Sequence, residues 1–299
     1  MRIGLVVGLH DGGADGDPAP RWHDIQEQVV AAEEVGFDVV ILEDALSFSG
    51  SGHWEAMTIA GAICAATTTI TVSHSVVNAP LRPPAVVARA AHTLDEISGG
   101  RYVLGIGAGN SPDDYEQFGI AADPRYSRFA ETVTVIHGLL RNSTFDYDGA
   151  FEVAHTPRFA PRGPRPSGPP LVIAAGGPKM LRLCARLADG WNWWGSPPDP
   201  NAVLRPVLEE LERACDEEGR DPASIIRTVD LYSYDVLGIT GADRPVWKVA
   251  GSADEIAHSI LELAEIGIDE VRVDVVARPG GRVDAVAAMA PVVEAVHRG

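Results

Sequence analysis

The stretch WEAMTIAGAICAATTTITVSHSVVNAPLRPPAVVARAAHTLDEISGGRYVLGIGAGN, residues 54–110, contains two helix–strand units in succession. An apolar helical pattern over residues 54–66 precedes the β-branched run 70–77. A second helical pattern over 84–98 ends at a Gly-Gly pair before the run 102–106. Short strands that alternate with helices are typical of a parallel sheet covered by helices.

The same alternation extends toward both ends of the chain. The other predicted strands are residues 2–9, 37–42, 171–174, 190–194, 227–236 and 270–276. The other predicted helices are residues 21–35, 127–141, 178–188, 200–218, 253–266 and 283–297. Eight strands and eight helices predict an α/β fold, a TIM (β/α)8 barrel. An open doubly wound sheet would also alternate, and the count of eight favours the barrel.

The alternation is interrupted between the fourth and fifth predicted strands. Residues 111–170 contain one clear helix, a Pro- and Gly-rich passage and the hairpin-like segment TFDYDGAFEV, residues 144–153. We interpret residues 111–170 as an insertion in a single barrel domain that comprises residues 1–299.

Composition and charge exclude several classes of partner. The 24 Lys and Arg against 42 Asp and Glu leave a formal charge of −18, which disfavours binding to nucleic acid or to an anionic membrane. The chain has no apolar stretch of 18 residues, and its N-terminal apolar run is too short for a signal peptide. Three isolated cysteines do not form a disulfide framework. We expect a cytoplasmic protein without nucleic acid or membrane among its partners.

Two glycine-rich turns follow predicted strands, where the loops of a barrel form the active-site face. The fourth strand leads into Gly107, Ala108, Gly109 and Asn110, which would let a ligand approach the backbone. This turn follows the fourth strand and does not open into a helix, so a Rossmann dinucleotide site is disfavoured.

The fifth strand leads into Ala175, Gly176 and Gly177, with Pro178 at a helix start and Lys179 in the first turn. Free helix amides beside an ammonium group predict a phosphate site, and an ordinary tight turn with a solvated lysine is the alternative.

The sixth strand, GWNWWGS, contains three of the six tryptophans. Because side chains alternate along a strand, Trp193 and Trp194 point to opposite sides, and at least one indole should face the barrel mouth. The cluster suits a flat aromatic ligand, and core packing is the alternative.

Candidate proton-transfer groups lie in the predicted mouth loops. Glu43 and Asp44 end the second strand, and either could accept a hydrogen bond or act as a general base, although Asp44 could also merely cap its loop. His10 and His53 lie in mouth loops. The sequence has no HxH, HExxH or CxxC motif, so we expect no metal site, and no GxSxG motif of a serine hydrolase.

These segments together resemble the luciferase-like monooxygenase superfamily, in its short F420-dependent branch. The family motif TLD-x-x-SGGR is matched by Thr93, Leu94, Asp95, Ser98, Gly99, Gly100 and Arg101, and G-x-G-A-G is matched by residues 105–109. Further similar segments are YEQFGI (115–120), RYSRFAE (125–131), GGPKMLRLCARLADGWN (176–192) and GSADEI (251–256).

The resemblance implies a barrel that binds coenzyme F420, or FMN as the alternative, at its C-terminal face. The cofactor phosphate would lie on the turn of residues 176–179. The ring would lie against strand three, where members often carry a bulge with a non-proline cis peptide. The expected cofactor-binding residues are Val76, Val77, Asn78, Gly107, Ala108, Gly109, Asn110, Ala175, Gly176, Gly177, Pro178, Lys179 and Trp194.

One position departs from the family pattern. Many deazaflavin-dependent members have a histidine after the strand-two acid, whereas Asp44 is followed by Ala45. Either His10 or His53 supplies proton transfer, or hydride transfer alone suffices. The catalytic candidates are therefore Asp44, His10 and His53.

The resemblance implies an F420-dependent oxidoreductase that transfers hydride between the deazaflavin and a small organic substrate. The alternatives are an FMN-dependent monooxygenase that uses reduced flavin and O2, with a flavin reductase as partner, and a non-catalytic flavin-binding protein. The resemblance also suggests a homodimer.

Overall fold

The computed structural model describes residues 1–11, 18–48, 51–109, 112–121, 123–156, 158–240, 248–278 and 280–299. Parallel strands form a closed barrel, with each strand paired to its neighbours in the order β1, β2, β5, β7, β10, β11, β12, β14 and back to β1. Their bounds are β1 Arg2–Val7, β2 Val39–Leu42, β5 Thr71–His74, β7 Tyr102–Gly107, β10 Leu171–Ala174, β11 Gly190–Trp194, β12 Ile226–Asp235 and β14 Glu270–Val275. The predicted eight-stranded barrel is confirmed.

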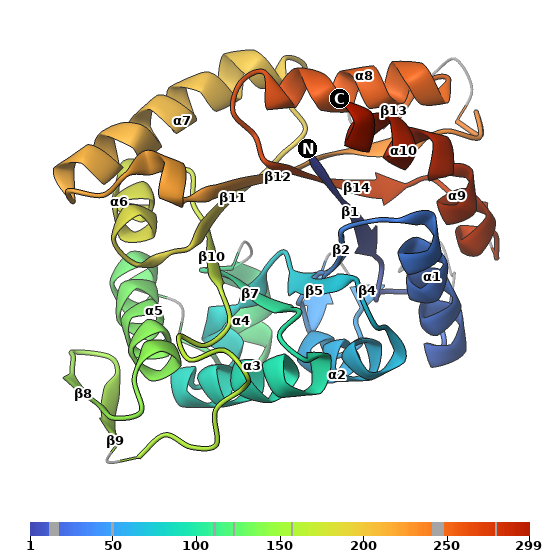
Figure 1. The fold of residues 1–299 in the computed structure, drawn as a ribbon. Coiled ribbons are helices and arrows are strands. Elements are labelled where there is room, and N and C mark those ends of the chain that lie inside the picture. The colour runs from blue at the N-terminus through green and yellow to red at the C-terminus, as the bar shows by residue number, and fades with distance from the viewer. Residues whose placement is uncertain are drawn as a thin grey trace.

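Helices surround the barrel on its outer side (Figure 1). They are α1 Trp22–Val35, α2 Ala56–Ala66, α3 Pro84–Ser98, α5 Arg125–Arg141, α6 Pro178–Leu187, α7 Pro200–Glu217, α8 Ala253–Ala264, α9 Arg282–Ala288 and α10 Ala290–Arg298. The predicted last helix, 283–297, is divided at Met289, because Pro291 has no amide hydrogen to continue the helical bonding.

The segment interpreted as an insertion, 111–170, contains one of the surrounding helices. α5 packs between α3 and α6 in the ring (Figure 1). The parts of this segment outside the ring are the short helix α4 Pro112–Gln117 and the antiparallel hairpin of β8 Phe145–Asp148 and β9 Val153–Thr156. The predicted hairpin is thus confirmed, while the helix belongs to the barrel's own repeating pattern.

Several short elements lie outside the predicted pattern. The hairpin of β3 Ser47–Phe48 and β4 Ser51–Gly52 follows β2, and β13 Lys248–Ala250 pairs with β12. The 3-10 helices are η2 Ala79–Leu81 and η3 Pro222–Ser224. The third predicted strand, 70–77, is not continuous: β5 ends at His74, and β6 Val77–Asn78 resumes beside β7.

Backbone groups at the N-terminal end of the barrel are bound by side chains. Glu33, near the end of α1, accepts hydrogen bonds at 2.6–2.9 Å from the amides of Thr68, Thr69 and Ile70. Arg101, between α3 and β7, donates at 2.6–2.9 Å to the carbonyl oxygens of Cys64, Thr67 and Ile70. The loop of residues 67–70 is therefore held through both its N–H and its C=O groups, and we call this arrangement the 67–70 clamp.

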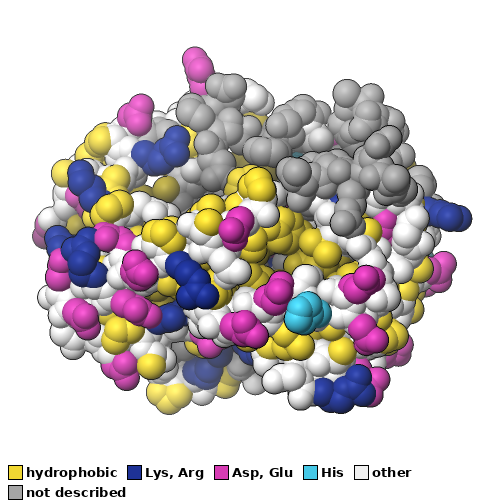
Figure 2. Space-filling model, turned by 90° about the horizontal axis from the view of Figure 1, so that it is seen from above, with side chains coloured by type: hydrophobic (Ala, Val, Ile, Leu, Met, Phe, Trp, Pro, Cys, Tyr) yellow, Lys and Arg dark blue, Asp and Glu magenta, His cyan; other side chains and the backbone are white. Residues whose placement is uncertain are grey.

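The surface reflects the acidic composition. On the side formed by α7 and α8, acidic side chains are dispersed among the basic ones rather than separated from them (Figure 2). Within the described part of the chain, no helix has both the length and the apolar character needed to span a bilayer.

Candidate active site

A cavity of about 590 Å³ lies at the C-terminal ends of the strands. Its lining comes from the segments that follow β1, β2, β5, β7, β10 and β11. The predicted residues that line it are His10, Asp44, His53, Val76, Asn78, Gly107, Ala108, Gly109, Ala175, Gly176 and Trp194. Segments far apart in the sequence thus meet at one site, as the barrel topology predicts.

The other predicted site residues do not line the cavity. Val77 is fully buried in the hydrophobic core. Gly177, Pro178 and Lys179 are exposed beside the cavity, at the beginning of α6. Asn110 lies outside the described residues.

The break in the third strand places Val76 in the cavity wall. The peptide bond between Ser75 and Val76 is cis, which confirms the bulge implied by the family resemblance. Gly107 on β7 makes room for this bulge, since a Cβ added there would lie 2.4 Å from Val76 Cγ2. A side chain at position 107 would therefore push Val76 out of place.

The glycine-rich turn after β7 is packed against Tyr115 of α4. The Tyr115 hydroxyl lies 2.9 Å from Asn78 Oδ1 and 3.1 Å from the carbonyl oxygen of Ala108. Gly109 has a φ of +76°, and a Cβ there would lie 1.1 Å from the same hydroxyl. Tyr115 was part of the family resemblance, and the structure gives it a physical role in joining two walls of the cavity.

The turn before α6 is built differently, because no atom of the described residues requires its glycines. A Cβ on Gly177 would have no neighbour within 4 Å, and one on Gly176 would have only the Trp193 ring, at 3.8 Å or more. No side chain caps the N-terminus of α6. The Lys179 ammonium lies beside it, 5.7 Å from the centre of the Tyr126 ring. The turn is open for an anion to approach the first amides of the helix.

Asp44 is occupied by contacts with the protein. Arg82 donates to its Oδ2 and Oδ1 at 2.5 and 2.9 Å, and the amide of Asn78 donates to Oδ2 at 2.9 Å. Arg82 also bonds Glu55. These contacts favour the alternative interpretation of Asp44, a residue that holds its loop, and its role as a general base stays a prediction. Arg82, which pairs with it from 38 positions away, was not predicted.

His10 and His53 face each other across an antiparallel bridge, with ring centres 5.2 Å apart. His10 Nδ1 lies 2.8 Å from the carbonyl oxygen of Asp11. Because a carbonyl only accepts, Nδ1 carries the hydrogen, and Nε2 is an acceptor whenever the ring is neutral. Burial and the neighbouring His10 lower the pKa of His53, which keeps that ring neutral.

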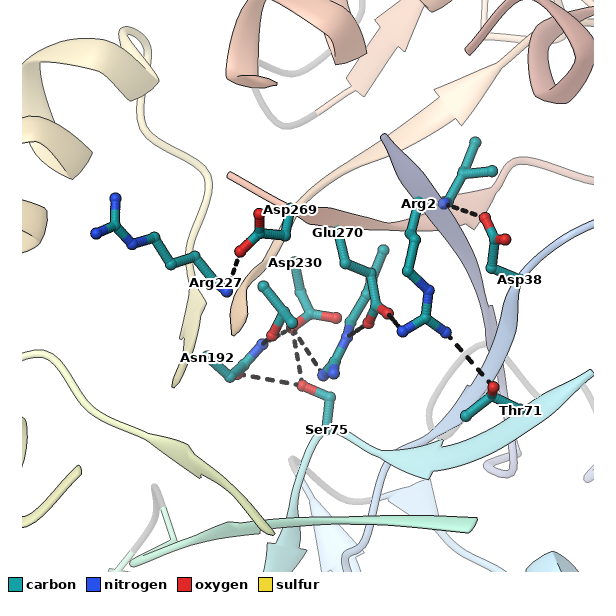
Figure 3. Close-up of polar contacts among 12 residues, drawn as sticks. Arg2, Asp38, Thr71, Ser75, Asn192, Arg227, Asp230, Asp269 and Glu270 are labelled. Carbon is teal, nitrogen blue, oxygen red and sulfur yellow. Dashed lines mark hydrogen bonds and ion pairs between the residues drawn. The ribbon is translucent and has the colours of Figure 1, made fainter. Parts of the chain in front are cut away.

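Beneath the cavity, polar side chains from separate strands meet inside the barrel (Figure 3). Ser75 Oγ donates to Asp230 Oδ2 at 2.8 Å, and Asn192 Nδ2 donates to the same oxygen at 2.6 Å. Asn192 also donates to Thr228 Oγ1 at 3.1 Å. The second oxygen of Asp230, Oδ1, is buried and has no hydrogen-bond partner among the described residues.

The network continues toward the N-terminal end of the barrel. Arg272 Nη1 lies 3.8 Å from Asp230 Oδ2, and its Nε donates to Glu270 Oε1 at 2.9 Å. Arg2 reaches the other oxygen of Glu270 at 3.2 Å. Burial raises the pKa of Asp230, and Arg272 only partly offsets this. The pattern Glu270-Val-Arg272-Val-Asp274 in the sequence is the signal that could have predicted an inward polar row.

The three clustered tryptophans of β11 have different environments. Trp191 is fully buried, and its Nε1 donates to the carbonyl oxygen of Ala175 at 2.7 Å. Trp193 and Trp194 line the cavity, and Trp194 is 67% exposed. Two indoles therefore form a wall suited to a flat ring.

The site thus combines a cavity at the strand ends, aromatic and backbone walls, a turn open to an anion and two facing histidines. The open glycines of the α6 turn and the recess that Gly107 leaves for Val76 fit a phosphorylated cofactor with a flat ring system.

Comparisons with known proteins identify the family of the chain. The family model for luciferase-like monooxygenases matches residues 1–234. The chain is similar to the F420-dependent glucose-6-phosphate dehydrogenase of Beutenbergia cavernae, with 35% identity over 181 residues, 58% of this chain and 52% of the relative. It is also similar to pyrimidine monooxygenase RutA of Escherichia coli K12, with 29% identity over 279 residues, 87% of this chain and 71% of the relative.

Among solved structures, the fold matches an F420-dependent secondary alcohol dehydrogenase in complex with an F420-acetone adduct, with a TM-score of 0.82, 20% identity and 99% of both chains covered. The chain belongs to the luciferase-like monooxygenase family of flavin- and deazaflavin-dependent oxidoreductases.

Proposed function

We propose that the protein is an F420-dependent oxidoreductase that exchanges hydride with a small organic substrate. The observation that carries this proposal is one cavity with two chemically different regions. The uncapped N-terminus of α6, with Lys179 exposed beside the cavity, supplies an anion site at one side of it. The His10 and His53 pair supplies proton-transfer groups in the other region.

F420 supplies or accepts the hydride when it is bound. In this proposal the backbone of Gly176 and Gly177 binds its phosphate, assisted by Lys179. Val76, Gly107 and Ala108 form the wall against its ring. Arg82 and Asp44 hold that wall in position through the amide of Asn78.

Two observations favour F420 over FMN. The relative named for F420 is the more similar of the two in identity, 35% against 29%. F420 carries an acidic tail beyond its phosphate, and the side of the cavity near α6 has cationic side chains that could bind it. These are Lys179 and Arg125, which reaches the carbonyl oxygen of Gly109 at 3.4 Å.

The alternative is an FMN-dependent monooxygenase that uses O2 and receives reduced flavin from a reductase. The similarity to RutA favours it, because that similarity extends over 87% of this chain. A flavin-binding protein without turnover is the second alternative.

Calorimetric titration of the protein with F420 and with FMN tests the proposal. We expect tighter binding of F420. Lys179→Ala should weaken binding about five- to tenfold, the equivalent of about 1 kcal/mol for a partly exposed charge. Gly177→Asp should weaken it more, since a carboxylate would face the phosphate.

Arg213→Ala is the matched control, because Arg213 lies on the exposed side of α7. It should leave the affinity for F420 unchanged. Tighter binding of FMN would move the protein to the monooxygenase alternative, and binding of neither would contradict both enzymatic functions.

A further inference from the structure

Two adjacent carboxylates at the end of β2 have opposite environments. Both line the cavity. Asp44 accepts three hydrogen bonds, from Arg82 and the amide of Asn78. Glu43 receives no hydrogen bond and forms no ion pair with any residue in the described part of the chain. One carboxylate therefore maintains the structure, and the other remains available to a ligand.

Side chains along β2 alternate between the barrel interior and the outer core, and this alternation explains the inward position of Glu43. Val39 and Ile41 face the barrel interior, where their side chains lie 2.7 and 2.5 Å from the position of a Cβ on Gly4. Glu43 continues this inward row, two residues farther along the strand direction. The intervening residues of β2 belong to the core under the helices.

Carboxylates from other strands act on Glu43 electrostatically. Burial raises the pKa of Glu43, and Asp274 and Asp230 raise it further, while His10 partly offsets these effects. Asp230 itself is only 8% exposed. The protonated form of Glu43 therefore persists above the usual range of a glutamate.

Two arginines face the same region. Arg272 lies beneath it and is shared between Asp230 and Glu270. Arg282 lies at the rim, where its Nη1 is 3.3 Å from the position of a Cβ on Gly8. Arg282 is exposed, so solvent screens its effect on Glu43.

We propose that Glu43 is the catalytic acid that exchanges a proton with the oxygen of an alcohol or carbonyl substrate. This inference rests on the proposed F420-dependent function. In the reducing direction, the carbonyl carbon gains hydride from reduced F420, the C=O π bond breaks, and the oxygen takes the proton of Glu43. In the oxidising direction, the C–H bond breaks with hydride going to oxidised F420, and the O–H proton goes to the Glu43 carboxylate. His10 Nε2, an acceptor in the neutral ring, exchanges this proton with solvent.

Infrared difference spectroscopy of the cofactor-free protein tests the protonation state directly. We expect a carboxylic-acid C=O band of Glu43 that persists above the pH range in which an ordinary glutamate is protonated and that is absent from Glu43→Gln. The band should remain in Asp230→Asn and in the control Glu96→Gln, since Glu96 lies on the exposed side of α3. If Glu43→Gln removes no such band, or if only Asp230→Asn removes one, the proposal is overturned.

Turnover of 2-propanol and cyclohexanol with F420 tests the catalytic role. Glu43→Gln should lower kcat about 10²- to 10⁴-fold, which is typical for loss of a general acid, with F420 affinity within twofold of wild type. Glu43→Asp should restore part of the rate with a shifted pH profile. Wild-type turnover in Glu43→Gln overturns the proposal. If the wild-type protein neither binds nor uses F420, the proposed function fails. The infrared band then still reports the protonation state of Glu43.

Discussion

Glu33 and Glu43 lie only ten positions apart in the sequence but near opposite ends of the barrel. Burial alone would raise the pKa of Glu33, but hydrogen bonds from the amides of Ile70, Thr69 and Thr68 outweigh it and lower the pKa to about 2. Glu43 has no such donors among the residues that the structure describes, and its pKa is raised by burial. The same residue type, glutamate, is thus stabilised in its ionised form near one end of the barrel and in its protonated form near the other.

The difference extends to other side chains at each end. At the N-terminal end, Arg101 is fully engaged with backbone carbonyls, and the Asp95 carboxylate is bound by Arg165. At the cavity end, atoms without partners among the described residues include His53 Nδ1 and Asp230 Oδ1. Polar groups stabilise the fold at one end, and the other end keeps polar groups free for a ligand.

Removal of Arg101 should give the largest effect on stability. Arg101→Leu leaves the carbonyl oxygens of the 67–70 clamp without their donor, and unsatisfied buried acceptors are costly. We expect the free energy of unfolding to fall by about 3–5 kcal/mol in urea titrations. The affinity of the folded protein for F420 should not change.

Arg298→Leu serves as the control for Arg101→Leu, because Arg298 makes only an exposed ion pair with Glu294. It should change stability by less than about 0.5 kcal/mol. An equal loss of stability in both variants would contradict the conclusion that polar groups at the N-terminal end of the barrel stabilise the fold.

Glu33→Gln should destabilise the protein by about 1–2 kcal/mol at pH 7, less than the pKa shift alone would give because the carboxylate is partly exposed. Since the folded pKa lies below the unfolded value of 4.5, the stabilisation is present above pH 4.5 and is lost as the pH falls toward 2. Urea titrations from pH 7 to pH 3 should therefore show the two proteins converging in acid. A constant difference across this range would rule out the ionised carboxylate as its source.

Glu43→Gln should have the smallest effect on stability and the opposite sign. The folded pKa lies above the unfolded value of 4.5, so the contribution of Glu43 to stability is unfavourable once the pH exceeds 4.5, is largest above the folded pKa, and disappears as the pH falls to 4.5. We expect a gain of up to about 1 kcal/mol at pH 8. A clear loss of stability at pH 8 would show that Glu43 has a structural partner.

Local sequence patterns predict much of the fold. The β-branched runs and the glycines that end helices locate all eight strands and nearly all the surrounding helices, because burial and turn geometry act over a few residues. The turn of residues 176–179 is also predictable, since a helix start after two glycines provides free amides whatever surrounds it. The break at Ser75 and Val76 follows from the family resemblance, while VSHSVV by itself is typical of a continuous strand.

The parts that could not be predicted depend on contacts between distant segments. Asp44 is bound by a residue 38 positions away, and Ser75 and Asp230 are 155 positions apart. Which of two adjacent carboxylates is bound by Arg82 depends on the strand register, and a shift of one residue would exchange the positions of Glu43 and Asp44. Sequence patterns therefore predict which chemical groups lie near the site. Contacts formed in the folded barrel determine which of these groups have a partner in the protein.

The 67–70 clamp also affects which parts of the protein unfold locally. Surface loops are usually the first segments to separate from a native structure, because few of their backbone groups are bound. In this loop the amides of Thr68, Thr69 and Ile70 are all bound to one carboxylate. The loop cannot detach without breaking contacts to α1 and to the start of β7, so it unfolds in the same cooperative unit as the strands.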